Sequence, residues 1–426
     1  MKSTSIFMNF EILKGTLDSE PLNQIKINQI LDILRKNFES YGFRPFDTPV
    51  IEFLDTLTYK YDETAEIVGE IFKLTDRGNR TLGLRYDLTT PLSRYVASKP
   101  QLKKPFRRYH IAKVFRDGPL KKGRLREFIQ CDCDVVGQDG IEIEAELMDL
   151  FYTSYTQIGI NSVIELNNNK ILRGALLQQG IEEKDLSSII LSIDKLKKIG
   201  IKGVLAELQE KGFDCDKVKQ GIDILCQKDF QCILKLAKNE VLIEGINELR
   251  TLVELISNLN VEYRLNFSMS RGLDIYTGNI WEAYDLDENI SSSIGSGGRY
   301  NRVIGEYANS QDEIPAVGIS FGLVPILACL EDKIDMKNGL TNTLVVPLSQ
   351  DVVAECYLIS KKLREEDSNV EIYYEYSMKK AFKYCDYLGV ENIVVVGKKD
   401  LENEFVKIKN LNTGEEKELT LNFLDK

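Results

Sequence analysis

The sequence of 426 residues predicts an α+β domain with an antiparallel sheet and a helical insertion, followed by a small α/β domain. Three observations predict this plan: a long antiparallel hairpin around 113–137, a polar helix-rich stretch at about 163–262, and alternating strand and helix patterns after residue 338. We therefore assign residues 1–330 to the first domain and residues 338–426 to the second.

The composition is typical of a globular protein. Hydrophobic residues make up 43% of the chain and charged residues 28%, and the formal net charge is −11. No apolar run approaches the ~20 residues that span a bilayer, so we expect a cytoplasmic protein without a membrane partner. The eight cysteines include no CxxC pair, which argues against both a disulfide framework and a zinc ribbon.

The hairpin is predicted by KVFRDGPLKKGRLREF at 113–128, which contains two strand patterns separated by a Gly-Pro turn. Arg116 stands at its base, where a guanidinium can hold a phosphate or a carboxylate with two hydrogen bonds. The tip carries Lys121 and Lys122 and is therefore suited to a nucleic-acid backbone.

The return strand contains the run CDCD at 131–134, which looks at first like a cluster of metal ligands. Because side chains alternate between the two faces of a strand, one face carries Gln130, Asp132 and Asp134, and the other carries both cysteines. Thiols on a strand are typical of a core face, and this spacing matches none of the usual zinc sites, so we predict no bound metal. The carboxylates on the other face require a polar or cationic ligand.

Two further segments complete the plan. NNNKILRGALLQQG and LRTLVELISNL, both within 163–262, have helical patterns and predict the insertion. After residue 338, TNTLVVPL, NVEIYYE and ENIVVVG have strand patterns and alternate with helical segments, which predicts the small α/β domain.

Several motifs in order resemble one family. The stretch RYHIAKVFRDGPLKKGRLREFIQCDCDVVG resembles motif 2 of the class II aminoacyl-tRNA synthetases, in the form found in histidyl-tRNA synthetases. YGFRPFDTPVIE (41–52) resembles motif 1, and LGLRYDLTTPLSRYVA (82–97) resembles the segment that presents an acid and a threonine to the substrate. SRGLDIYTGNIWEAY (270–284) and SGGRYNRVIGEY (296–307) resemble the histidine-specific element and the glycine-rich loop after it, and the last domain resembles an anticodon-binding domain.

The resemblance implies the class II synthetase fold and a homodimer that activates histidine with ATP and Mg²⁺ and transfers it to the histidine tRNA. It implies Arg116 and Arg271 as catalytic residues, because cations must stabilise the charge that develops at the α-phosphate. It implies tRNA contacts at Lys121 and Lys122, and ATP contacts at Arg116, Arg124 and Arg302. The expected histidine-binding residues are Asp87, Leu88, Thr89, Arg116, Gln130, Asp134, Arg271, Ile275 and Tyr276.

The resemblance also implies which of these residues bind which group of the substrate. The α-amino group is expected to bind at Asp87, Thr89 and Gln130, and the imidazole at Asp134 and Tyr276. Asp134→Ala should then abolish histidine binding and leave the fold intact. Gly297 and Gly298 are expected in a loop whose backbone closes over the ligand.

Three positions depart from the family pattern. Val324 and Pro325 stand where motif 3 usually has an acid and an arginine that holds the ATP γ-phosphate, and loss of such a contact weakens binding by roughly 1.5–3 kcal/mol. We expect Arg302 to replace that arginine. Gly118 replaces the usual acid of motif 2, and Ile275 replaces the first tyrosine of RGLDYY.

One alternative stays open. A synthetase paralogue can bind histidine without charging tRNA, like the regulatory subunit of ATP phosphoribosyltransferase. Such paralogues typically lack the anticodon-binding domain that this chain is predicted to have, so we favour the enzyme. His110, the single histidine of the chain, is predicted to be structural, which leaves general-base work in this site to substrate oxygens or carboxylates.

Overall fold

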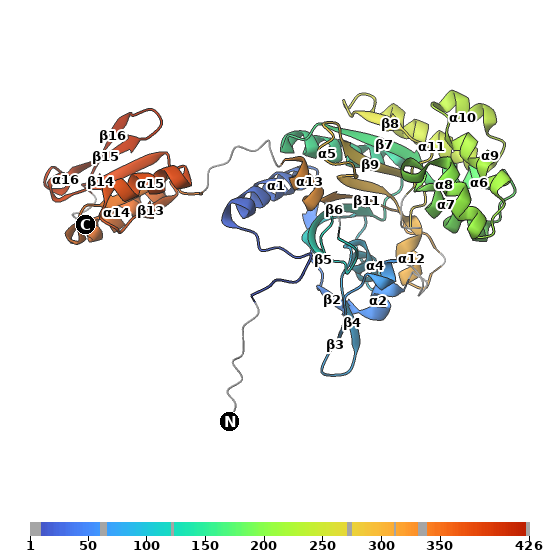
Figure 1. The fold of residues 1–426 in the computed structure, drawn as a ribbon, viewed down its shortest axis with the longest axis horizontal. Helices are drawn as coiled ribbons and strands as arrows, with labels where there is room; N and C mark the ends of the chain where they lie inside the picture. Colours follow the sequence, from blue (N-terminus) through green and yellow to red (C-terminus); the bar gives the residue numbers. More distant parts are fainter. Residues whose placement is uncertain are drawn as a thin grey trace. The chain divides into compact units, whose positions relative to one another are not determined.

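The computed structural model describes residues 10–59, 66–120, 123–270, 275–310, 312–330 and 339–422. It divides into two compact units (Figure 1), one within residues 1–332 and the other formed by residues 333–426 together with Asp18–Gln29.

The first unit is built on an eight-stranded sheet. Its interior pairs are antiparallel, as the sequence predicts, whereas the pairs at the two edges, β1 with β5 and β7 with β8, are parallel. In spatial order the strands are β1 (Arg44–Pro45), β5 (Phe106–Phe115), β6 (Glu127–Val136), β11 (Ala316–Gly322), β10 (Gly295–Arg299), β9 (Asn279–Asp285), β7 (Ser162–Asn168) and β8 (Tyr263–Leu265).

Helices α1 (Pro21–Ser40) and α5 (Ile141–Ile158) supply aromatic side chains to one face of this sheet. The ring of Phe321 on β11 lies 5.7 Å from Phe38 of α1 and 4.8 Å from Phe151 of α5, between ring centroids. Cys131 lies opposite Phe321 in the register of β6, and both Cys131 and Cys133 are fully buried. The prediction that the two thiols face the core is confirmed, and the carboxylates of CDCD are directed to the other face of the sheet.

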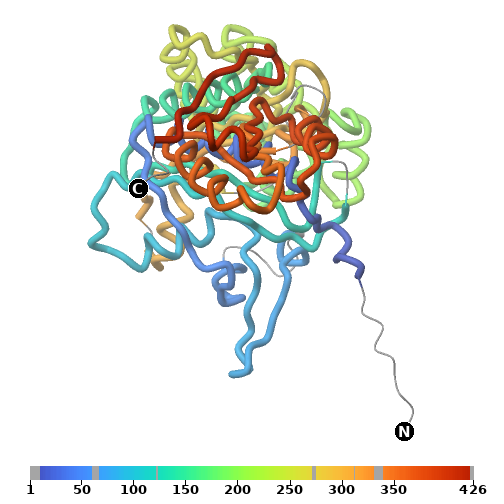
Figure 2. Tube along the Cα trace, turned by 90° about the vertical axis from the view of Figure 1, so that its left-hand side faces the viewer, coloured from blue at the N-terminus to red at the C-terminus, as the bar shows by residue number. Residues whose placement is uncertain are grey.

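A three-stranded sheet lies beside the large one, in the order β2 (Ile51–Phe53), β4 (Thr81–Leu84) and β3 (Lys73–Thr75). Figures 1 and 2 both show the β3–β4 hairpin extending away from the rest of this unit. The short helices around the two sheets are α2 (Leu54–Thr58), α3 (Glu66–Gly69), α4 (Thr89–Ala97), α12 (Asn301–Tyr307) and α13 (Leu323–Cys329).

The helical insertion begins later than the sequence suggests. Residues 162–168 form β7 and belong to the large sheet, whereas the sequence predicts 163–168 to be part of the insertion. The two asparagines at the end of β7 obscure its strand pattern in the sequence. In the structure both asparagines are buried and hydrogen-bonded. The insertion comprises α6 (Asn169–Leu177), η1 (Glu183–Asp185), α7 (Leu186–Ile193), α8 (Leu196–Glu210), α9 (Cys215–Leu225), α10 (Phe230–Leu236) and α11 (Glu240–Ile256).

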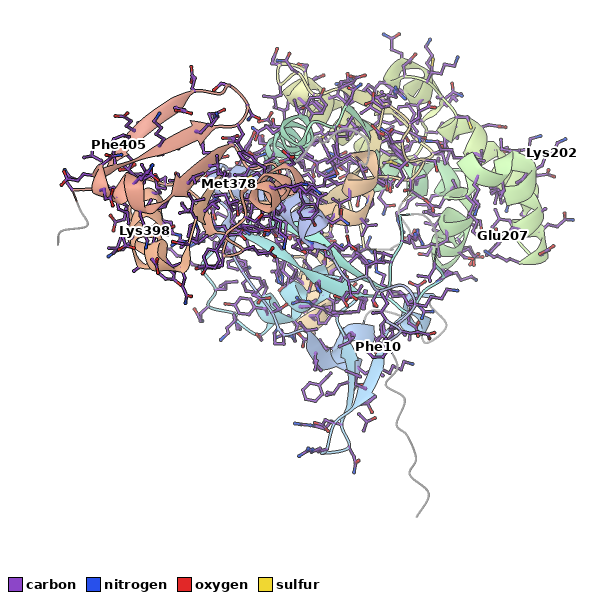
Figure 3. All side chains as sticks on the ribbon, turned by 60° about the vertical axis from the view of Figure 1, so that its left-hand side comes forward. Phe10, Lys202, Glu207, Met378, Lys398 and Phe405 are labelled. Carbon is purple, nitrogen blue, oxygen red and sulfur yellow. The ribbon has the colours of Figure 1, made fainter. Side chains whose placement is uncertain are left out.

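Several helices of the insertion start at the side-chain caps that helix physics favours. Asp214, Asp229 and Asn239 each accept a backbone N–H of the first turn of the helix that follows. The outer surface carries ion pairs, such as that of Glu207, labelled in Figure 3, with Lys195 and Lys211 at 2.8 Å each. These helices therefore form a capped bundle with a charged outer surface.

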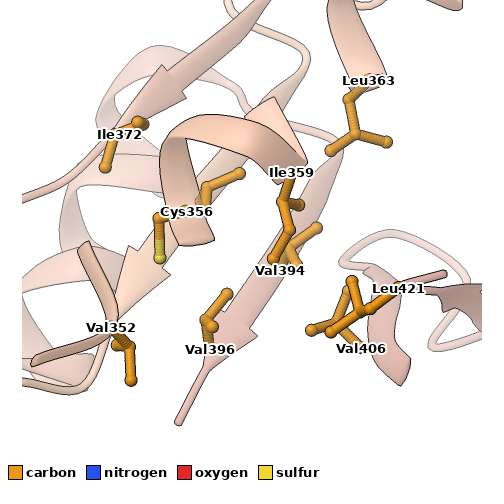
Figure 4. Close-up of a cluster of buried hydrophobic side chains, with 10 residues drawn as sticks. Val352, Cys356, Ile359, Leu363, Ile372, Val394, Val396, Val406 and Leu421 are labelled. Carbon is orange, nitrogen blue, oxygen red and sulfur yellow. The ribbon is translucent and has the colours of Figure 1, made fainter. Parts of the chain in front are cut away.

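The second unit is a five-stranded sheet with helices on both faces. One core cluster, drawn in Figure 4, packs α14 (Val353–Glu365) against the sheet, and another packs α15 (Met378–Leu388) against the opposite face. The strands, in order, are β13 (Val370–Ile372), β12 (Thr343–Pro347), β14 (Asn392–Val396), β15 (Phe405–Asn410) and β16 (Glu416–Thr420), with η2 (Gln350–Val352) and α16 (Lys398–Glu402) between them. This arrangement confirms the predicted α/β domain.

Candidate functional site

The polar face of β6 is positioned by strands on both sides. Its three polar residues, Gln130, Asp132 and Asp134, alternate with buried residues, as the sequence predicts. In the order β5, β6 and β11, the cross-strand neighbours are Ala112, Gln130 and Gly322; His110, Asp132 and Ser320; and Arg108, Asp134 and Gly318. The face therefore brings two carboxylates next to a buried arginine and two glycines.

Asp134 is held by two partners from distant parts of the chain. Nη2 of Arg108 lies 2.7 Å from its Oδ2, and the hydroxyl of Tyr300 donates to its Oδ1 at 2.5 Å. All three side chains are buried. Burial raises the pKa of Asp134, while the charge of Arg108 and the hydrogen bond from Tyr300 act in the opposite direction.

Glycines make room for this carboxylate. A Cβ at Gly318 would lie 2.1 Å from Oδ1 of Asp134, and one at Gly297 would lie 2.5 Å from Nε1 of Trp281. The result is a recess over β6, β10 and β11, lined by Thr89, Asp132, Asp134, Ile275, Tyr276, Ser296, Gly297, Gly298, Tyr300, Gly318, Ile319 and Ser320. We call it the acidic recess.

The prediction that Gly297 and Gly298 lie in a loop is wrong. Both residues lie within strand β10, which pairs with β9 and with β11. Both positions are glycine because neighbouring groups fill the space that a side chain would need. At Gly298, a Cβ would lie 2.6 Å from the ring of Tyr276. The two residues line the acidic recess from the sheet instead of closing over it.

Asp87 and Leu88 lie in the connection from β4 to α4, and Thr89, the first residue of α4, lines the acidic recess. The carboxylate of Asp87 is buried and accepts the backbone N–H of Thr90 at 3.0 Å, which satisfies a donor in the first turn of the helix. The carbonyl of Leu88 accepts from Nη2 of Arg108 at 3.3 Å, so this turn is tied to the same arginine as Asp134.

Arg116 directly follows β5 and lies in a second cavity, of about 150 Å³. Its Nε donates to the carbonyl of Tyr86 at 3.0 Å, and its guanidinium lies over the ring of Phe128, 5.2 Å from the centroid. Burial lowers the pKa of Arg116. This cavity, which we call the arginine cavity, is lined by Glu70, Arg116, Gly118, Pro119, Gly123, Arg124, Leu125, Phe128, Gly322, Val324 and Pro325.

The Glu70 carboxylate occupies the space of a side chain at Gly118, where motif 2 usually has an acid. A Cβ at Gly118 would lie 2.5 Å from Oε1 of Glu70, so the Glu70 carboxylate occupies that part of the arginine cavity. Asp117, adjacent in sequence, is instead paired with Arg126 at 3.2 Å.

Arg302 does not reach the arginine cavity. It lies on α12, lines a separate cavity of about 600 Å³ and has its Nε 3.9 Å from Glu313. The expectation that Arg302 replaces the arginine missing at Pro325 stays a prediction, although helix α12 places Arg302 in a different cavity from the one that Arg116 and Pro325 line.

Three of the expected residues, Arg271, Lys121 and Lys122, lie outside the described residues. Ile275 is buried and belongs to an apolar cluster with Leu92 and Tyr300. Tyr276 is partly buried against that cluster, and both residues line the acidic recess.

His110 is buried on β5, with Nε2 2.8 Å from Oδ1 of Asp47. Burial lowers its pKa to about 4, so the ring is neutral at pH 7. No group of three or more potential metal ligands occurs among the residues that the structure describes, nor does that part of the chain contain a helix able to span a membrane.

Sequence reasoning missed Arg108, Tyr300 and Ser320, and it left Asp132 without a role. The alternation along β6 did place Asp132 on the polar face, and that signal was sufficient to select it. The arginine and the tyrosine gave no such signal, because their relation to Asp134 depends on strand pairing and on a contact between positions 166 residues apart.

Comparison with known proteins gives two family matches. A model described as histidyl-tRNA synthetase matches residues 15–326, and one described as an anticodon binding domain matches residues 342–426. The chain is 36% identical to histidine–tRNA ligase 1 of Bacillus cereus, over 98% of this chain and 97% of that protein. It is 37% identical to histidine–tRNA ligase 2 of Shouchella clausii, over 97% and 99% of the two chains.

Solved structures agree in fold. A histidyl-tRNA synthetase from Nostoc sp. PCC 7120 superposes with a TM-score of 0.83 at 27% identity, covering 98% of this chain and 99% of the other. A protein from Bacillus halodurans described as an ATP phosphoribosyltransferase regulatory subunit/histidyl-tRNA synthetase has a TM-score of 0.77 at 18% identity, covering 93% and 99%; at that identity it shows the fold alone.

Proposed function

The chain belongs to the histidyl-tRNA synthetase family, and on this premise we propose that it activates histidine with ATP and transfers the histidyl group to the histidine tRNA. Members of this family are aminoacyl-tRNA synthetases, and so is this protein. The observation that supports the detailed reaction is the order of sites along β6: the arginine cavity at Phe128, then Gln130, then the acidic recess at Asp132 and Asp134.

Adenylate formation brings the substrate carboxylate to the α-phosphate of ATP, and both groups are negative. Arg116 is fixed by Tyr86 and Phe128, so its guanidinium is preorganised to hold the two groups together. Arg271 would act on the phosphate from the other side, and Arg124 would bind ATP from the wall of the arginine cavity. Mg²⁺ would enter with ATP, and Glu70 offers a carboxylate of the kind that this ion accepts.

The amino acid would lie along β6. The α-amino group would be bound by Asp87, Thr89 and Gln130, and the imidazole would enter the acidic recess, which contains Asp134 and Tyr276. A recess of buried hydrogen-bonding groups discriminates against apolar rings, because such a ring would leave those groups unpaired.

The second unit would bind tRNA, since residues 342–426 match the anticodon binding domain. The hairpin tip with Lys121 and Lys122 would contact the phosphate backbone of the tRNA. This substrate would place the enzyme in the cytoplasm, with the translation machinery.

A homodimer is supported by exposed apolar residues in motif 1. On and beside β2, Val50, Ile51 and Phe53 are 39%, 49% and 53% exposed. Apolar side chains gathered at one place on a surface are typical of an interface. Sedimentation analysis should give twice the chain mass, and a monomer at micromolar concentration would contradict this assembly.

The test of the function is amino-acid-dependent ATP–pyrophosphate exchange with the purified protein and each of the twenty amino acids. Exchange with histidine alone is expected. Pro325, in the arginine cavity, favours a second candidate, a histidine-binding regulatory paralogue. Histidine binding by calorimetry without exchange would support that candidate instead.

A further inference from the structure

Asp132 is a buried acid in the acidic recess to which neither the family resemblance nor the proposed roles assign a function. It is 3% exposed, and its Oδ1 has no hydrogen-bond partner among the described residues. A buried carboxylate oxygen without a partner is costly, so such groups are rare unless a ligand completes them. Asp132 lines the recess next to Asp134.

Among the residues that the structure describes, the charges around the recess leave Asp132 as the acid in excess. Asp87, Asp132 and Asp134 act on one another electrostatically, but Arg108 is paired with Asp134. The positive charge of Arg116 interacts electrostatically with the negative charge of Asp87. Burial accordingly raises the pKa of Asp132 to about 7, and Arg108 only partly opposes this effect.

The two acids of the recess are not equivalent. Oδ1 of Asp134 accepts a hydrogen bond from Tyr300, and its Oδ2, although it has no hydrogen bond among the described residues, is ion-paired with Nη2 of Arg108 at 2.7 Å. Asp132 shares a side-chain hydrogen bond with Ser320, which in turn accepts from Nε2 of Gln130 at 3.1 Å. These neighbours orient the Asp132 carboxylate and leave its Oδ1 without a hydrogen-bond partner among the described residues.

We propose that Asp132 accepts a ring N–H of the histidine substrate and is a further specificity-determining residue, while Asp134 shapes the recess and holds Arg108. The position fits: the recess contains Asp132 and Asp134 but not Gln130, so it corresponds to the side-chain end of the substrate. A ring without an N–H would leave the Asp132 carboxylate buried and unpaired. This inference rests on the proposed function.

Calorimetric titration of histidine into the full-length protein tests the inference. The Asp132→Asn variant should bind histidine about 10- to 100-fold more weakly, since it loses a hydrogen bond to a charged acceptor. Its KM for ATP should stay within about threefold of the wild-type value, because Asp132 does not line the arginine cavity. The matched control is Asp285→Asn, which removes another buried carboxylate of the same sheet away from the recess and should bind histidine normally.

A structure of the wild-type protein with bound histidine provides a second test that does not depend on how the variant folds. A ring nitrogen within hydrogen-bond distance of Oδ1 of Asp132 would support the inference. Pairing of Asp132 with the free Nε or Nη1 of Arg108, with the ring elsewhere, would overturn it. Unchanged histidine affinity of Asp132→Asn would overturn this inference alone, whereas a wild-type protein that binds no histidine would overturn the proposed function with it.

Discussion

Arg108 and Asp134 face each other across β5 and β6 as a buried ion pair, with 2.7 Å between Nη2 and Oδ2. Both side chains are almost fully excluded from solvent, and Tyr300 supplies the further hydrogen bond that such a pair requires. The ion pair therefore contributes to the stability of the sheet and is also part of the site.

The pair changes the prediction for Asp134→Ala. The sequence alone suggests loss of histidine binding with an intact fold, but removal of the carboxylate leaves the Arg108 charge buried without a partner. We expect the free energy of unfolding to fall by about 3–5 kcal/mol. Chemical denaturation measures it, and Asp134→Leu combined with Arg108→Met should recover most of the loss. Equal stability of Asp134→Ala and the wild type would refute the structural role.

The raised pKa of Asp132 makes stability depend on pH. Burial raises this pKa from 3.8 to about 7, so the folded protein binds more protons than the unfolded chain between these values. The contribution of Asp132 to stability is thus most favourable below pH 4 and is lost as pH rises to about 7. Without histidine, Asp132→Asn should be more stable than the wild type at pH 8, by up to about 4 kcal/mol, and the difference should shrink towards pH 5. Melting temperatures across this range, with Asp285→Asn as control, measure the effect; a difference independent of pH would contradict it.

Arg116→Ala should lower the rate of histidine-dependent pyrophosphate exchange by about 10²–10³-fold, because a fixed cation at the reacting phosphate is lost. Arg124→Ala is the matched control, since Arg124 lines the same cavity, and it should act mainly on the KM for ATP. A larger rate loss in Arg124→Ala than in Arg116→Ala would reverse the two assignments.

Gly318→Ala tests the shape of the acidic recess. The new methyl group would overlap Oδ1 of Asp134, at 2.1 Å, so the carboxylate must move. We expect the KM for histidine to rise at least about tenfold with little change for ATP. Gly322→Ala, whose Cβ would meet Pro325 at 3.2 Å and the carbonyl oxygen of Ile294 at 3.6 Å, is the control on the same strand. A normal KM for histidine in Gly318→Ala would show that this register does not shape the substrate site.

Pro325→Arg should restore the arginine that motif 3 usually carries. Pro325 lines the arginine cavity, so a guanidinium there can reach a phosphate of ATP. The KM for ATP is expected to fall about 10-fold, as for one added charge-assisted contact. Pro325→Ala separates the new charge from the loss of the proline ring and should leave the KM unchanged.

Features that depend on local patterns could be predicted from the amino-acid sequence. Alternation along 130–135 separated the thiols from the acids, two strand patterns around a Gly-Pro turn predicted the antiparallel pair of β5 and β6, and periodicity indicated both the insertion and the α/β domain. These predictions succeeded because side-chain direction in a strand and the period of a helix are fixed by backbone geometry.

The other features of the site depend on contacts between elements and could not be predicted from local patterns. Tyr300 reaches Asp134 from 166 residues away, and strand pairing alone places Arg108 beside that acid. Pairing with β9 and β11 puts Gly297 in a strand, and the direction of α12 carries Arg302 to another cavity. No local pattern encodes such relations, because they arise only when distant segments share a sheet and bury their charges together.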